Sequence, residues 1–230
     1  MTTQLLLAAS VLLAACSGAQ IDSERATLGG TPDQTEPLTT AAPDTSLAVA
    51  YFAGGCFWCT EASFERLAGV QAVVSGYSGG TSPDPTYEQV GSGQTDYAEA
   101  IAIYYDSTVV DYPTLLDVFF VAHDPTTLNR QGPDKGPQYR SAVFYRNPTE
   151  RELTQAAIER VEGAGRYPDE VVTEVGAFTG FYPAEDYHQG YYELHPENPY
   201  VRNVSRPKVE KVEKEFAEIL KPAYRSEKRS

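Results

Sequence analysis

Hydrophobic and polar positions alternate along several short stretches of the chain, as they do in half-buried β-strands. The clearest stretch runs from Ala98 to Tyr105, where Glu99, Ile101 and Ile103 fall on one face. Other apolar runs end at glycine, proline or charged residues and predict further strands. We predict strands over Val49–Ala53, Val70–Tyr77, Ala98–Tyr105, Ser141–Tyr145 and Thr173–Ala177.

Helical signals lie between these strands. Pro113 suits the first position of a helix, and Asn147 suits the N-cap before another. Loops are expected over Ser78–Pro85 and His123–Gln138, and an irregular tyrosine-rich stretch after the last strand. The helices are predicted over Phe57–Ala68, Pro113–Ala122, Pro148–Gly163 and Pro207 to about Leu220. Short strands alternating with helices predict an α+β protein built as a two-layer α/β sandwich.

The first part of the chain has a different character. Leu5 to Ala15 is apolar and too short to span a bilayer, but it fits the core of a signal peptide, although no Lys or Arg precedes it. The segment ends at Cys16 in a sequence that resembles the lipobox of bacterial lipoproteins; a plain signal peptide is the alternative. We therefore expect an exported, periplasmic or cell-envelope lipoprotein anchored at Cys16. The predicted divisions are a signal peptide with lipobox at 1–16, a flexible linker at 17–46, one domain at 47–222 and a tail at 223–230.

The net charge and the number of cysteines limit which partners and which kinds of site we expect. A net charge of −14 disfavours nucleic acid and anionic membrane surfaces, so membrane contact is expected only through the lipid anchor. The three cysteines, Cys16, Cys56 and Cys59, are too few for a disulfide scaffold. A structural zinc site needs four Cys or His ligands, and the single Cys-x-x-Cys pair has no suitably spaced histidines. We expect no bound metal or other cofactor.

The segment Gly54-Gly55-Cys56-Phe57-Trp58-Cys59 carries the strongest chemical signal. Two glycines at a strand-to-helix turn allow a sharp bend, and the first N–H groups of the helix are expected to stabilise a Cys56 thiolate. Cys59 lies three residues on, where it can form a disulfide with Cys56. Two readings stay open from the residues alone: a buried core cysteine for Cys56 and an inert helix cysteine for Cys59.

Other side chains complete a possible site. Phe57 and Trp58 offer apolar surface beside the thiol, or ordinary core packing. Glu99 begins a buried row, which predicts a raised pKa and a protonated carboxyl that can act as an acid; a solvated strand-end charge is the alternative. In the loop that follows His123, Asp134 is a second candidate carboxylate and Tyr139 a candidate hydroxyl donor.

These segments together resemble the peptide methionine sulfoxide reductase family of the A type, in its Cys-Phe-Trp-Cys subtype. The matching pieces occur in family order over about residues 48–200. They are Gly-Gly-Cys-Phe-Trp-Cys at 54–59, Gly-Tyr-Ser-Gly-Gly at 76–80, Pro-Thr-Tyr at 85–87, Ser-Gly-Gln-Thr-Asp-Tyr-Ala-Glu-Ala at 92–100, His-Asp-Pro at 123–125, Gln131-Gly132 with Asp134, Gln-Tyr-Arg-Ser at 138–141 and Ala-Glu-Asp-Tyr-His-Gln at 184–189.

The resemblance implies an elaborated ferredoxin-like core and reduction of the S epimer of methionine sulfoxide, free or in peptides and proteins. It implies Cys56 as nucleophile and Glu99 as proton donor, and Cys59 is the only candidate resolving cysteine because the tail from 200 to 230 contains none. A thioredoxin-type dithiol is the expected external reductant, and the enzyme is expected to be a monomer. The substrate-binding residues that it implies are Phe57 and Trp58 for the methyl group and Tyr87, Asp134 and Tyr139 for the oxygen.

Two alternatives from other classes remain at this stage. A Cys-x-x-Cys pair at a helix start also fits a thioredoxin-like thiol–disulfide oxidoreductase, which would act on disulfides. The other alternative is a non-enzymatic lipoprotein that binds peptides through aromatic side chains. In such a protein, alkylation of Cys56 would leave ligand binding and all activity unchanged.

Overall fold

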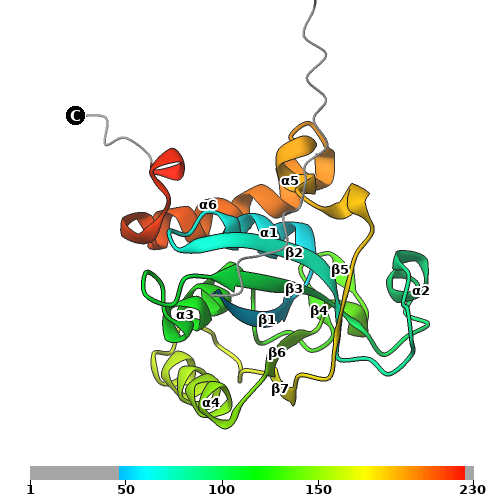
Figure 1. Ribbon diagram of the computed structural model, residues 1–230, viewed down its shortest axis with the longest axis horizontal. Helices are drawn as coiled ribbons and strands as arrows, with labels where there is room; N and C mark the ends of the chain where they lie inside the picture. Colours follow the sequence, from blue (N-terminus) through cyan, green and yellow to red (C-terminus); the bar gives the residue numbers. More distant parts are fainter. Residues whose placement is uncertain (1–46, 226–230) are drawn as a thin grey trace, which may run out of the picture. The chain divides into compact units, whose positions relative to one another are not determined.

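The computed structural model describes residues 47–225, and its centre is a sheet of six strands in the order β7-β6-β1-β3-β2-β8 (Figure 1). Only β6 and β7 pair in parallel. The bounds are β1 Ala48–Gly54, α1 Phe57–Glu65, β2 Val70–Ser78, α2 Tyr87–Gly91, β3 Ala98–Tyr105, α3 Tyr112–Ala122, β4 Arg130–Gln131, β5 Asp134–Lys135, β6 Ser141–Tyr145, α4 Pro148–Gly163, β7 Glu174–Ala177, β8 Phe181–Pro183, α5 Tyr191–Leu194 and α6 Arg206–Glu215.

The inner strands β6-β1-β3-β2, with α1 following β1 and α3 following β3, have the strand–helix–strand–strand–helix–strand order of a ferredoxin-like fold. The three pairings among these four strands, β6 with β1, β1 with β3 and β3 with β2, are all antiparallel. The predicted α+β sandwich with a ferredoxin-like core is therefore confirmed.

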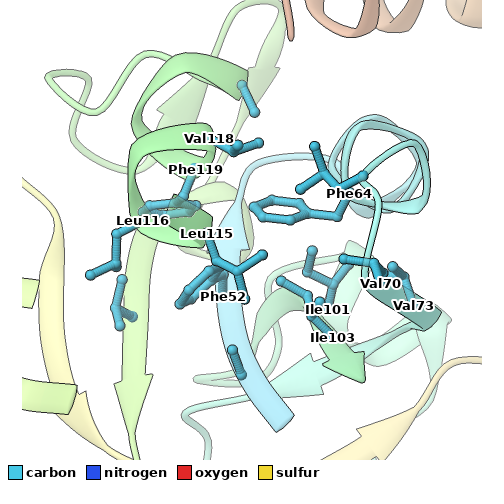
Figure 2. Packing of buried hydrophobic residues seen from close by; sticks show 14 of the residues in the cluster. Phe52, Phe64, Val70, Val73, Ile101, Ile103, Leu115, Leu116, Val118 and Phe119 are labelled. Carbon is cyan, nitrogen blue, oxygen red and sulfur yellow. The ribbon is translucent and has the colours of Figure 1, made fainter. Parts of the chain in front are cut away.

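Helices α1 and α3 cover one face of this sheet. Phe52 of β1 lies at the centre of the core, with its ring centroid 5.8 Å from that of Phe64 in α1 and 5.0 Å from that of Phe119 in α3 (Figure 2). Ile101 and Ile103 of β3 are fully buried in the same cluster. The period-two pattern of β3 thus places Glu99 on this helix-covered face.

The opposite face is lined by small side chains and is covered by the chain around β8. Tyr51 stacks on Phe178 with ring centroids 4.0 Å apart, and Phe181 packs in the same cluster. A Cβ atom at Gly76 would lie 2.4 Å from the Phe181 ring. Glycine at this position is what lets the covering segment approach β2 so closely.

Several element boundaries differ from the prediction. Helix α1 ends at Glu65 instead of Ala68, because Leu67 forms a β-bridge with Leu220. Helix α6 ends at Glu215, before a short 3-10 turn. The predicted loop His123–Gln138 contains the β4–β5 hairpin, and the tyrosine-rich stretch contains β8 and α5. Helix α2 lies between the predicted loop Ser78–Pro85 and β3, where no element was predicted, and all of these elements are too short to give a periodic signal.

A buried arginine holds α1 to the C-terminal part of the fold. Arg66 is 4% exposed, and its guanidinium donates to Glu213 at 2.6 Å and to Glu193 at 2.8 Å. It also lies 5.0 Å from the ring centroid of Tyr192 and 4.7 Å from that of Tyr224. These contacts join the C-terminal end of α1 to α5, α6 and the last described turn.

A buried carboxyl in the middle of α1 makes stability depend on pH. Burial raises the pKa of Glu61 to about 8, although the Gly190 N–H donates to its Oε1 at 3.0 Å. The unfolded chain releases this proton near pH 4.5 and the folded chain keeps it, so the contribution of Glu61 to stability is fully present below pH 4.5 and is lost as pH rises towards 8.

We expect Glu61→Gln to reduce this loss by up to about 1.4 kcal/mol per pH unit between pH 5 and 8. Glutamine keeps the acceptor for Gly190, and its amide can donate to the Ser75 hydroxyl, which lacks a partner among the described residues. Denaturant unfolding at several pH values measures the effect. Equal slopes for the variant and the wild type would show that Glu61 ionises normally in the folded protein.

Some predictions fall on residues outside this description. The signal peptide, the lipidated Cys16 and the linker lie in 1–46, and the last part of the predicted tail lies in 226–230. Export and lipid anchoring therefore stay predictions. Within residues 47–225, no helix combines the length and hydrophobicity needed to cross a bilayer.

Candidate active site

The turn between β1 and α1 carries Cys56. Gly55 has a φ of +86°, which side chains rarely adopt, and a Cβ there would lie 2.5 Å from Gln131. This glycine lets the chain reverse from the strand into the helix within two residues. Cys56 then occupies the N-cap position of α1, as the sequence predicts.

The predicted stabilisation of a Cys56 thiolate by helix N–H groups is wrong for this structure. The Phe57 N–H donates to Glu99 Oε2 at 3.1 Å, and the Cys56 side chain accepts no capping hydrogen bond. Burial raises the pKa of Cys56, and the neighbouring Cys59 and Glu99 raise it further. The helix dipole is outweighed because Cys56 is only 6% exposed and faces groups that carry negative charge when ionised.

Glu99 lies beside the thiol as an acid. Its side chain is 2% exposed, and burial raises its pKa to about 8. The hydrogen bond from Phe57 fixes the carboxyl against the first turn of α1. The predicted burial of the carboxyl at the start of β3 is confirmed, and its raised pKa favours the protonated form at neutral pH.

Aromatic rings form one wall of the site. Phe57 is buried in the core, 5.1 Å from the His188 ring, whereas Trp58 is half-buried and stacks on Tyr191 with centroids 3.8 Å apart. The Trp58 indole N–H donates to His188 Nδ1 at 3.2 Å, and His188 also lies 4.2 Å from the Tyr87 ring. The sequence alone assigned no role to His188 or Tyr191. The one signal that could have pointed to His188 is its place in Ala-Glu-Asp-Tyr-His-Gln at 184–189, one of the segments that carry the family resemblance.

Hydroxyl groups and a carboxylate form the other side. Burial raises the pKa values of Tyr87, to about 12, and of Tyr139, and the charges of Glu99 and Asp134 add to this at both tyrosines, so both phenols lie near these carboxyl groups. Asp134, at the β4–β5 hairpin, accepts a 2.5 Å hydrogen bond from the Tyr200 hydroxyl. The structure therefore brings together all the predicted oxygen-binding residues.

Tyr200 is a site residue that the sequence did not reveal. Its hydroxyl donates to Asp134 and is close enough to Cys56 to affect the pKa of that thiol, and its ring meets Trp58 edge-on with centroids 5.9 Å apart. With sixteen tyrosines in the chain, composition could not single it out. Tyr200 comes directly before an irregular helical turn, so only the three-dimensional structure reveals that it belongs to the site.

The second cysteine is close to the first. Cys59 is 1% exposed, and the two thiols are free and close enough to shift each other's pKa. Interaction with Cys56 is the largest cause that lowers the pKa of Cys59, to about 7, against the effect of burial. The pair is thus asymmetric, with the more readily ionised sulfur at Cys59.

This arrangement suits reduction of a small polar oxide. A thiol, a neutral carboxylic acid and several phenols surround one point, next to an aromatic wall that fits an apolar substituent. Over residues 47–225, no three His, Cys, Asp or Glu side chains gather as ligands for a metal ion.

Comparisons with known proteins agree on one family. A family model described as peptide methionine sulfoxide reductase matches residues 48–220. Peptide methionine sulfoxide reductase MsrA of Natronomonas pharaonis is 53% identical over 171 residues, covering 74% of this chain and 96% of the relative. The enzyme of that name from Thermus thermophilus is 48% identical over 174 residues, covering 76% of this chain and 98% of the relative.

Two solved structures are similar to this one. Mxr1 from Saccharomyces cerevisiae in reduced form has a TM-score of 0.62 and 32% identity, with 70% of this chain and 92% of that chain covered. Methionine sulfoxide reductase A of Corynebacterium diphtheriae has a TM-score of 0.61 and 32% identity, with 67% and 78% covered.

Proposed function

The chain belongs to the peptide methionine sulfoxide reductase A family and is an oxidoreductase that reduces methionine sulfoxide, and from this premise we propose how it does so. Its substrate is the S epimer, free or peptide-bound, and its cycle passes through a Cys56 sulfenic acid and a Cys56–Cys59 disulfide. The observation that carries the proposal is the hydrogen bond from Phe57 to Glu99, which fixes a neutral carboxyl beside Cys56.

In the first step, the Cys56 sulfur attacks the sulfoxide sulfur. Glu99 gives a proton to the sulfoxide oxygen as the S–O bond breaks, and the hydroxyls of Tyr87 and Tyr139, with Asp134, hold that oxygen. The substrate gains two electrons and leaves as methionine, and Cys56 loses two and becomes a sulfenic acid. Phe57 and Trp58 provide the surface against which the substrate methyl group packs.

In the second step, Cys59 attacks the Cys56 sulfur, forming the S–S bond and releasing the oxygen as water. An external dithiol of the thioredoxin type then reduces this disulfide by exchange. The position of Cys59 one helical turn after Cys56 supports the proposal, because side chains three residues apart on a helix are neighbours.

Separate R and S epimers of methionine sulfoxide, each supplied with a dithiol, test the substrate assignment. We expect methionine from the S epimer at a rate at least about 100-fold above that from the R epimer, because a site with one fixed acid and one apolar wall fits a single arrangement around sulfur. Chromatography of the released methionine gives both rates. Comparable rates would contradict the assignment.

Replacing Cys59 by serine tests the resolving step. The variant should form about one methionine per enzyme molecule and then stop when thioredoxin is the reductant, because its sulfenic acid finds no second thiol. Quenched-flow measurement of methionine per active site shows this burst. Undiminished thioredoxin-driven turnover would mean that another group resolves the sulfenic acid, and it would also exclude a thioredoxin-like reading of the Cys-x-x-Cys pair.

A further inference from the structure

Two side chains from α6 and the turn before it reach Cys59, although they lie about 150 residues further along the chain. The thiol of Cys59 donates to the Ser205 Oγ at 3.2 Å, and Ser205 is itself fully buried. Lys208 is half-buried, and its Nζ lies 4.0 Å from the Cys59 Sγ. These contacts belong to the second cysteine and take no part in the reduction step described above.

An irregular helical turn produces this placement. Val201–Ser205 forms a π-helix that continues directly into α6. A π-helical stretch widens the helix and changes which side chains face inward, and such stretches are frequent at functional sites. Ser205 and Lys208 are three residues apart, so both fall on the face that meets α1.

The charges around Cys59 favour its ionised form. Interaction with Cys56, the Lys208 charge and the Ser205 hydroxyl each lower the pKa of Cys59, and burial and Asp134 act in the opposite direction. No comparable cation lies among the groups that set the pKa of Cys56, which is raised. Apart from the effect of the two sulfurs on each other, the groups from α6 and the turn before it therefore favour the thiolate at Cys59 alone.

We propose that Ser205 and Lys208 are positioning residues that hold the Cys59 sulfur as a thiolate, and so decide which sulfur attacks and which sulfur leaves in the second half of the cycle. This inference rests on the proposed Cys56–Cys59 disulfide. When Cys59 ionises, the Ser205 hydroxyl turns to donate to it, and the Lys208 ammonium balances its charge.

The Cys59 thiolate forms a bond to the Cys56 sulfur, and the S–O bond of the sulfenic acid breaks, with one proton taken up to release water. A reductant thiolate then attacks the Cys56 sulfur, and Cys59 leaves as the thiolate beside Lys208. The second thiol of the reductant, as its thiolate, displaces Cys56 and becomes part of the reductant's own disulfide.

The exposure of the two sulfurs and the stability of the departing thiolate both favour attack by the reductant on Cys56. Cys56 is 6% exposed and Cys59 only 1%, with Ser205 and α6 against it. Thiol–disulfide exchange is faster when the departing sulfur has the lower pKa. The mixed disulfide with the reductant should therefore form on Cys56.

Lys208→Met tests the kinetic part in the full mature protein. With one equivalent of methionine sulfoxide at pH 6 and no reductant, loss of the Cys59 thiol should slow by about threefold for each unit by which its pKa rises, because each unit lowers the thiolate fraction about tenfold and raises the nucleophilicity of the thiolate only about threefold. Methionine formation should slow much less. Lys208→Arg should restore most of the rate, and Lys214→Met, which removes an exposed charge two turns further along α6, is the matched control.

A thiolate titration separates this role from a structural one. In a Cys56→Ser background, the ultraviolet absorbance of the Cys59 thiolate should appear at higher pH when Lys208 is replaced by Met or Ser205 by Ala. An unchanged titration together with an unchanged rate of thiol loss would overturn the proposal. Failure of the wild type to form any Cys56–Cys59 disulfide would instead overturn the proposed function.

Trapping the exchange intermediate tests the direction of attack. The oxidised enzyme is incubated with a thioredoxin that lacks its resolving cysteine, and the cross-linked peptides are identified by mass spectrometry. The expected product joins thioredoxin to Cys56. Cross-linking mainly through Cys59 would show that Cys56 is the leaving sulfur and would contradict the proposal.

Discussion

Replacing Cys56 by serine is expected to abolish the formation of methionine, lowering the rate by at least about 10⁴-fold, as the loss of a nucleophile does in other enzymes. A serine hydroxyl does not attack sulfoxide sulfur, and the neighbouring Cys59 is buried behind Cys56 against Ser205. Chromatographic detection of methionine with excess dithiol gives the rate, and circular dichroism confirms that the variant is folded.

Cys59→Ser is the control for the Cys56→Ser variant. Both variants remove one thiol from the same helical turn, so they disturb packing to a similar extent. Only Cys59→Ser should still release about one methionine per molecule. If Cys56→Ser released methionine at the wild-type rate, the assignment of the nucleophile would be wrong.

Replacing Glu99 by glutamine is expected to slow methionine formation by about 10²- to 10⁴-fold, the usual contribution of a general acid. Glutamine keeps an oxygen that accepts the hydrogen bond from Phe57, so the first turn of α1 stays in place while the acidic proton is lost. The rate of a single turnover with excess methionine sulfoxide, without any reductant, isolates this step from disulfide recycling.

Glu61→Gln is the matched control for Glu99→Gln. Glu61 is also 2% exposed with a pKa raised to about 8, but it accepts from Gly190 and does not contact Cys56. We expect its single-turnover rate to stay within about twofold of the wild type, since it offers no proton to the reacting atoms. Equal losses in both variants would point to a general effect of buried carboxyl groups and away from acid catalysis by Glu99.

The long elements of the fold were predictable from local patterns. The bounds of β3, β6 and α4 agree with the predictions, because alternation marks the strands and Asn147 caps the helix with a hydrogen bond to the Glu150 N–H. The short helix α2 was missed, although Thr86 and Gln89 form a capping box there. A helix of one turn depends on contacts made elsewhere in the chain, such as the bond from the Tyr87 N–H to Glu185.

The candidate site was only partly predictable for the same reason. Cys56 and Cys59 follow from a local motif, and the burial of Glu99 from the alternation in β3. Tyr200 and Ser205 reach the site through a π-helical turn, and no period in the sequence reveals it. The ionisation of Cys56 was misjudged because the donor expected to stabilise it is taken by Glu99, which is distant in sequence.

Arg66 lies at the C-terminal end of α1, and the two thiols lie at the opposite end of this helix. Its ion pairs with Glu193 of α5 and Glu213 of α6 anchor the C-terminal end. The proposed disulfide would form in the first turn of this helix, where Cys59 contacts Ser205 of the turn before α6. We therefore expect oxidation to leave the Arg66 contacts at the other end of the helix in place. A protein built in this way suits maintenance work, in which each cycle is completed locally, and is poorly suited to reporting the oxidative state of its surroundings.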